Sequence, residues 1–220
     1  MITSWQEMEK LALEYGFLPF FNCGIKGFSV EENTPSHLWF SPVEPGPWEW
    51  KKDAALNGRV VYGKFFNHRA GFISLRWFPD FANYRRDGYD LDALYDEGRV
   101  PMHDRAVYDM IVKHHALDTK ALKAYCGFGK DGLKGFEPII DRLQMQTYVN
   151  IRTFLYPLDR NGKEYGWGIA QYTTPEEMFG QKRVTAAYSR TPEESRMRIL
   201  KHLRKKLPQA SERQLNKLIG

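Results

Sequence analysis

The sequence predicts an α+β fold whose central segment, residues 102–173, is a winged helix: three short helices followed by a two-stranded hairpin, the wing. Three observations predict it. A glycine-rich turn spans 127–135, and the apolar residues of 136–143 recur at the spacing of a buried helical stripe. Asn161-Gly162 then joins two strand-like runs and supplies the positive φ values of a tight hairpin.

The helix starts within this segment follow from capping residues. We expect the first helix to begin at His103-Asp104 and the second at Asp118-Thr119. In the second helix, Leu122, Tyr125 and Cys126 are expected to face inward. The third helix begins near Phe136 and runs directly into the first wing strand, 146–156, which pairs with 164–172. A generic α+β fold does not require that direct passage from helix to strand.

Residues 1–101 are predicted to form an aromatic-rich α+β region with a β-hairpin. This region holds 20 of the 32 aromatic residues. In chain order we expect a helix from Trp5 to Tyr15, loop and short strand over 17–58, a hairpin of Val60–Phe66 and Gly71–Trp77, and a linker over 79–101. Ser4 is the expected N-cap of the helix, and Gly16 is expected to end it.

Residues 174–220 are predicted to be basic helices that pack on the rest of the chain. Thr174-Pro175-Glu176-Glu177 and Thr191-Pro192-Glu193-Glu194 each combine an N-cap, a proline at the first helical position and a capping-box glutamate. Met197, Leu200, Leu203 and Leu207 are expected to form the inner face of the longer helix. Ser211 begins a short final helix.

The charge of the chain is distributed unevenly. Residues 1–102 carry 11 Lys and Arg against 14 Asp and Glu, whereas residues 103–220 carry 21 against 13. A regional excess of this kind indicates a polyanionic partner, and DNA is the partner we expect. The alternative is a soluble domain with a solvated basic face.

Several classes of protein are disfavoured by composition. No apolar run approaches the ~20 residues of a membrane span, and the N-terminus does not resemble a signal peptide. Cys23 and Cys126 are too far apart for a zinc motif or a disulfide framework, so we expect a cytoplasmic protein without metal. The glycines of 127–135 lack the ending of a phosphate-binding loop, and we expect no cofactor.

The wing, the third helix and the basic C-terminal helix hold the candidate phosphate contacts. They are Lys130, Lys134, Arg142, Arg152, Arg160, Lys163, Arg196, Lys201 and Lys205. Glu137 and Asp141 lie on the polar face of the third helix, where they would repel phosphates. That face is therefore either a reader of cytosine amino groups in the major groove or a solvated face that does not touch DNA.

Trp48 and Trp50 are candidates for stacking on flipped or single-stranded bases, because prolines and charged residues surround them. In a strand they would share one face. The alternative is that both belong to the hydrophobic core, as most aromatic residues of a small domain do.

Several short runs resemble the AlkZ-related proteins, which are small bacterial relatives of the AlkZ/YcaQ-type DNA glycosylases. The runs are Gly46-Pro47-Trp48-Glu49-Trp50-Lys51, Tyr62-Gly63-Lys64-Phe65-Phe66, Trp77-Phe78-Pro79, Arg85-Arg86 and Tyr165-Gly166-Trp167. The resemblance implies winged-helix units, a DNA-binding ancestry and a link to DNA repair. It also implies a catalytic role for Gln144 and Gln146, which match the Gln-x-Gln string of the glycosylases. Here the string ends the third helix, so the alternative is a structural cap.

Three functions follow from these observations. The first is a winged-helix DNA-binding protein without chemistry of its own. The second is a DNA glycosylase that acts on alkylated or otherwise damaged bases. The third is a protein–protein interaction module, for which we expect the third helix to be buried against residues 1–100 or against another subunit.

Overall fold

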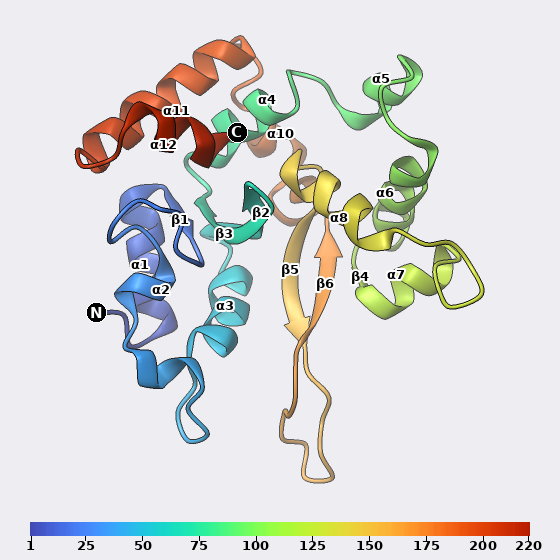
Figure 1. Ribbon diagram of the computed structural model, residues 1–220. Helices are drawn as coiled ribbons and strands as arrows, with labels where there is room; N and C mark the ends of the chain where they lie inside the picture. The colour runs from blue at the N-terminus through green and yellow to red at the C-terminus, as the bar shows by residue number, and fades with distance from the viewer.

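A computed structural model describes all 220 residues and shows an α+β fold with one six-stranded antiparallel sheet (Figure 1). The strand order is β1-β3-β2-β5-β6-β4. The strands are β1 (Phe17–Pro19), β2 (Val60–Phe66), β3 (Arg69–Ser74), β4 (Leu117–Asp118), β5 (Asn150–Leu155) and β6 (Ile169–Thr173). A single residue pair, Tyr62 and Ile151, joins β2 to β5 and makes one sheet of the two groups of strands.

Twelve α-helices and one 3₁₀-helix surround the sheet. The first half of the chain contains α1 (Trp5–Tyr15), α2 (Val30–Asn33), η1 (Ser36–Trp39), α3 (Pro47–Leu56), α4 (Phe78–Arg85) and α5 (Leu91–Asp96). The second half contains α6 (Met102–His114), α7 (Thr119–Tyr125), α8 (Phe136–Met145), α9 (Pro175–Phe179), α10 (Gln181–Val184), α11 (Pro192–Lys206) and α12 (Glu212–Ile219). None of these helices combines the length and the apolar composition that crossing a membrane requires.

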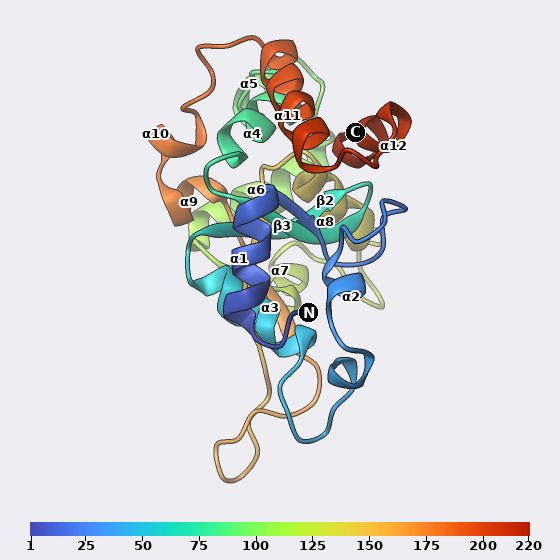
Figure 2. The same ribbon diagram turned by 90° about the vertical axis from the view of Figure 1, so that its left-hand side faces the viewer.

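Helices cover both faces of the β1-β3-β2 part of the sheet. Because side chains alternate along a strand, neighbouring residues enter different layers. Tyr62 and Phe72 face the layer of α1 and α3, whereas Val61 and Ile73 pack with α4, α11 and α12 (Figure 2). Burial on both faces explains why β2 is almost continuously apolar.

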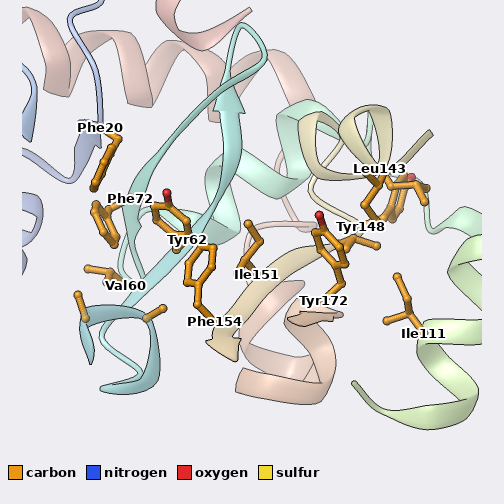
Figure 3. Close-up of a cluster of buried hydrophobic side chains, with 14 of the residues drawn as sticks. Phe20, Val60, Tyr62, Phe72, Ile111, Leu143, Tyr148, Ile151, Phe154 and Tyr172 are labelled. Atoms are coloured by element: carbon orange, nitrogen blue, oxygen red, sulfur yellow. The ribbon is translucent and has the colours of Figure 1, made fainter. Parts of the chain in front are cut away.

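The larger of the two cores crosses the seam between β2 and β5. Figure 3 shows a row of buried side chains that starts at Phe72, passes through Tyr62 and Phe154, and reaches Leu143 and Ile111 on the far side. Residues from the first and the second half of the chain therefore bury their apolar surface against one another, which is the main stabilising contribution in a fold of this size.

The predicted hairpin of the first half is confirmed, with a tighter turn than expected. Asn67 and His68 are the only two residues between the strands, with φ values of 48° and 66°. Positive φ at both central positions is the geometry of a two-residue hairpin turn that matches the strand twist. The turn projects toward α8, where the His68 amide lies 3.2 Å from the Met145 sulfur.

The predictions of loop and short strand over 17–58 and of a linker over 79–101 were wrong where the structure forms α3, α4 and α5. At α3, Gly46 is the N-cap, Pro47 occupies the first turn, and the Glu49 carboxylate accepts a 2.8 Å hydrogen bond from the Gly46 amide. Pro79 likewise lies in the first turn of α4. Prolines that indicate turns in a sequence are equally suited to helix starts.

The central segment contains the expected helices, and its strands are shorter than expected. Phe136, Ile139, Ile140 and Leu143 of α8 are all buried, as the stripe predicts. Residues 156–168 form a long loop between β5 and β6 (Figure 1). Tyr125 is 57% exposed, so the prediction that it faces inward was wrong. Its ring instead stacks on His114 at 4.8 Å.

The predicted starts of α9, α11 and α12 are confirmed by their caps. The hydroxyls of Thr174, Thr191 and Ser211 each accept a hydrogen bond from the backbone amide three residues later. Along α11 the inner face contains Ile199, whereas Met197 is 47% exposed, so the prediction that Met197 faces inward was wrong.

Arg86 links three elements that are distant in the sequence. It is 3% exposed and follows α4. Its guanidinium donates to the Thr147 carbonyl at 2.7 Å, in the turn after α8, and to the Glu176 carboxylate of α9 at 2.5 Å. The buried cation is therefore paired and hydrogen-bonded, as burial of a charge requires.

Candidate nucleic-acid interface

The acidic residues of α8 form ion pairs with basic residues of other elements of the protein. Glu137 pairs with Lys123 at 2.5 Å, and Asp141 pairs with His68 and, at 3.2 Å, with Lys64. The second pairing joins α8 to the β2–β3 hairpin. The outward face of α8 is therefore nearly neutral and partly covered by the first half of the chain.

Arg142, the basic candidate on α8, is also engaged. Its guanidinium donates two hydrogen bonds, of 2.9 and 2.7 Å, to the Asp104 carboxylate of α6, which is almost fully buried. These hydrogen bonds raise the pKa of Arg142. A guanidinium held in this bidentate geometry has few donors left for a phosphate.

Gln144 and Gln146 do not face a common space. Gln144 is fully buried; its side-chain oxygen accepts from the Lys64 amide at 3.1 Å, and its amide nitrogen donates to the Ile140 carbonyl at 3.1 Å. Gln146 is the exposed C-cap of α8. The catalytic role of the pair stays a prediction, and the hydrogen bonds of Gln144 show how it joins α8 to β2.

The candidates on loops are exposed and dispersed. Arg160 and Lys163 lie in the loop 156–168, and Lys130 lies in the glycine-rich turn. The Lys134 ammonium donates to the Gly129 carbonyl at 2.6 Å, so it closes its own turn. Arg152 is exposed on β5. Among these five residues, all except Lys134 present charges that form no ion pair or side-chain hydrogen bond within the protein.

The base of the loop 156–168 is attached to α3. The Tyr156 hydroxyl donates to the Trp48 carbonyl at 3.2 Å, and the Trp167 ring meets the Trp48 ring edge-on at 5.9 Å. Lys52 adds an ion pair with Glu164. Trp48 is half-buried at this junction, whereas Trp50 is 3% exposed and belongs to the core. The two tryptophans thus point to different sides of a helix and do not share the face of a strand.

Helix α11 presents a row of basic residues at helical spacing. Its buried side contains Ile199, Leu200 and Leu203, while Arg198, Lys201 and Lys205 are exposed along the opposite side. Lys201 and Lys205 form no ion pair. The predicted contact Arg196 points elsewhere: it pairs with Glu193 at 3.3 Å and with the Asn216 side chain at 2.5 Å.

Two further arginines, Arg76 and Arg183, were not indicated by the sequence. Arg76, Arg190 and Arg198 line one cavity of about 240 Å³, and Arg152 and Arg183 line another of about 350 Å³. The segment 183–187 contributes Arg183 to the second cavity and Ala186 and Ala187 to the first. We call the resulting surface the basic track; its members are Arg76, Arg152, Arg183, Arg190, Arg198, Lys201 and Lys205.

The surroundings of His202 and Asp80 show the positive charge of the basic track. Burial, together with the nearby cations Lys206, Arg76 and Lys205, lowers the pKa of His202. Asp80, which is 5% exposed, lies 3.3 Å from Arg190 and 3.2 Å from Arg198. One buried carboxylate thus faces two arginines, and the remaining cations of the track have no comparable partner. The surface therefore keeps a net positive charge.

The basic track and the loop 156–168 lie far apart. In both views α11 lies at one end of the molecule, and the tip of the loop lies at the other (Figures 1 and 2). Among the predicted contacts, the structure places Lys201 and Lys205 one helical turn apart on the exposed side of α11. It does not bring them together with Arg160 and Lys163.

The amino-acid sequence matches the model of one protein family. A model of the family described as AlkZ related matches residues 2–220, which is nearly the whole chain. No curated protein and no solved structure matches the chain. No group of three or more histidine, cysteine, aspartate or glutamate side chains is arranged to hold a metal ion. Since the family model spans almost every residue described above, this protein belongs to the AlkZ-related family.

Proposed function

We propose that the protein is a non-catalytic DNA-binding protein that contacts the phosphate backbone mainly through the basic track. Family membership supports a DNA-related role. The observation that carries the proposal is the row Arg198, Lys201 and Lys205 on α11, of which Arg198 also lines a cavity with Arg76 and Arg190. Phosphate contacts of this kind fix the protein on a duplex without reading its sequence.

Residues 102–173 form the winged helix of this proposal. The supporting observation is the order α6, β4, α7, α8, β5 and β6, in which the short strand β4 pairs with β6. A third helix followed directly by a hairpin is the arrangement of winged-helix DNA-binding domains. The neutral face of α8 argues for a docking unit in which this helix is not the main reader of bases.

Salt dependence tests the proposal. We expect a labelled duplex to bind at low salt, with a log–log slope against salt of about −0.9 per phosphate neutralised. Replacing Arg198, Lys201 and Lys205 by Gln should make that slope shallower by about 2, because Lys201 and Lys205 are unpaired whereas Arg198 pairs with Asp80. The matched control is Arg204→Gln on the same helix, because Arg204 already pairs with Glu212.

Two outcomes would contradict this assignment. Absence of duplex binding at low salt removes the DNA-binding function itself. The second outcome is that the salt-dependence slope is unchanged in the α11 triple variant but reduced in the double variant Arg160→Gln, Lys163→Gln. That result would assign the DNA interface to the loop 156–168. Fluorescence anisotropy over a series of salt concentrations measures all of these slopes.

DNA glycosylase activity is the second candidate, and family membership favours it. Incubation with alkylated duplex should then release bases and leave abasic sites, which alkaline cleavage detects. Release that survives the double variant Gln144→Ala, Gln146→Ala would remove both residues from the mechanism. Gln144→Ala also removes two buried hydrogen bonds, so thermal unfolding of each variant must be compared first.

A protein–protein interaction module is the third candidate. The packing of Asp141 and Gln144 of α8 against the β2–β3 hairpin supports this interpretation of the helix. In that case duplex binding is absent.

A further inference from the structure

A cavity of about 350 Å³ lies where the base of the loop 156–168 meets α3 and η1. It shares no lining residue with the basic track. Its wall includes Trp39 of η1, Trp48 and Lys51 of α3, and Trp167 of the loop. This volume falls within the range of sites that hold small organic ligands, and such sites are typically apolar with a few polar groups.

Three indole rings form the apolar part of the wall. Trp39 and Trp48 lie 5.7 Å apart at nearly a right angle, and Trp48 and Trp167 lie 5.9 Å apart in the same type of arrangement. Trp167 is 72% exposed although it is a large aromatic residue. Exposed indoles at the mouth of a cavity provide faces on which a flat ring can stack.

The polar part of the wall contains Lys51 and Glu49. The Lys51 ammonium lies 4.0 Å from the centroid of the Phe154 ring and 4.8 Å from that of Trp48, and it forms no ion pair. The Glu49 carboxylate accepts a hydrogen bond from the Gly46 amide. Burial lowers the pKa of Lys51 to about 8, and the nearby charge of Glu49 acts in the opposite sense. Lys51 is thus a donor without a hydrogen-bonded partner, and a ligand that supplies acceptors or negative charge would pair with it.

We infer that this cavity binds a nucleotide, with its base stacked on Trp167 and its phosphate paired with Lys51. A nucleotide combines a flat ring, which can stack on the exposed indole, with acceptors and a negative charge, which can pair with the Lys51 ammonium. The inference extends the proposed function, because the nucleotide has two sources: an unpaired residue of a bound DNA strand or a free mononucleotide.

The fluorescent base 2-aminopurine tests both sources, since stacking on tryptophan quenches its emission. One arm uses the free 5′-monophosphate of 2-aminopurine deoxyribonucleoside. The other uses an oligothymidylate strand that carries a single 2-aminopurine. We expect quenching in at least one arm, and weakening of the apparent affinity by about tenfold in Trp167→Ala, the typical effect of losing one stacking partner.

The control lies on the same loop. Tyr165→Ala removes a neighbouring exposed aromatic residue that does not line the cavity. This control should quench like the wild type. Lys51→Met should weaken binding, whereas Trp167→Ala is not expected to unfold the protein because the side chain is exposed.

A pH series separates an ionic role of Lys51 from a purely structural one. The other titratable groups that line the cavity are Glu49 and Tyr156, and burial raises the pKa of Tyr156 to about 12. Wild-type affinity should therefore fall between pH 7 and 9 as Lys51 loses its proton. The affinity of Lys51→Met should stay constant over that range.

Each outcome has one meaning. Quenching of the free nucleotide alone identifies a free ligand, and quenching within the strand alone identifies an unpaired DNA residue. Absence of quenching in both arms, or equal quenching in Trp167→Ala and the wild type, overturns the inference. Duplex binding through the basic track is measured without the fluorescent base, so the proposed function stands or fails separately.

Discussion

Helices α8 and α11 both present charged faces to the surface, but their charges are used differently. On α8, the charges of Glu137, Asp141 and Arg142 are paired with other elements of the protein. On α11, Lys201 and Lys205 are exposed without partners. A charged helix face therefore indicates a polyanion-binding surface only when its charges are not already neutralised within the fold.

Substitutions of paired and unpaired charges should therefore change different measured quantities. Paired charges should contribute to the free energy of unfolding, and unpaired surface charges should contribute to binding alone. Arg86 is a paired charge that is almost fully buried. Lys51 differs from both groups, because it is mostly buried but forms no ion pair. The free energy of unfolding can therefore rank these residues.

The largest effect is expected for Arg86→Met. Loss of the buried guanidinium leaves the Glu176 carboxylate and the Thr147 carbonyl without their partner, which should cost about 3–5 kcal/mol. Urea denaturation followed by circular dichroism measures the change. The double variant Arg86→Met, Glu176→Leu should recover part of the loss, and a single variant within 1 kcal/mol of the wild type would contradict the pairing.

Lys51 should give a pH-dependent effect of intermediate size. Since burial lowers its pKa to about 8, the unfolded chain binds a proton that the folded chain releases between pH 8 and about 10. Stability should rise with pH over that window, by at most about 3 kcal/mol. Burial raises the pKa of Cys23 and Cys126, which acts in the opposite sense above pH 9.

Comparison with Lys51→Met isolates the lysine, because both proteins contain the same cysteines. The difference in unfolding free energy between wild type and variant should change with pH between 8 and 10 and stay constant between 6 and 7. A difference that is independent of pH throughout would show that the ammonium is well solvated.

The smallest effects form a matched pair on the two helices. Arg142→Gln should cost about 1–3 kcal/mol, because the buried Asp104 carboxylate loses two hydrogen bonds. Lys201→Gln should stay within about 0.5 kcal/mol of the wild type. Thermal and urea unfolding of the two variants measure this difference in stability directly. Equal losses of unfolding free energy would contradict the distinction between paired charges on α8 and unpaired charges on α11.

The parts of the fold that were predictable from sequence have local causes. The stripe from Phe136 to Leu143 predicts the buried face of α8, and the capping threonines Thr174 and Thr191 predict two helix starts to the residue. Each signal is contained in a few neighbouring residues. Helix α3 was missed because Gly46-Pro47 has the composition of a turn, although Glu49 three residues after the N-cap is also a capping signal.

The candidate sites depend on contacts between distant segments and were predictable only in part. Lys201 and Lys205 are visible as one face of an amphipathic helix. Arg76 lies beside Arg198 only because the turn after β3 and helix α11 line one cavity, and Arg183 lies beside Arg152 only because α10 and β5 line another. Similarly, no local pattern shows that Trp167 meets Trp48 or that Lys123 neutralises Glu137.

The seam between β2 and β5 also affects the order in which the chain acquires its structure. Residues 67–149 separate the two strands, and one residue pair joins them. During synthesis the hydrogen-bonding edge of β2 is complete long before β5 emerges, so it stays open while the ribosome makes five further helices and two strands. An apolar strand edge that stays exposed until its partner strand is synthesised is prone to pair with another chain. Slower synthesis or a lower temperature should therefore increase the yield of folded protein, since both reduce encounters between unfinished chains.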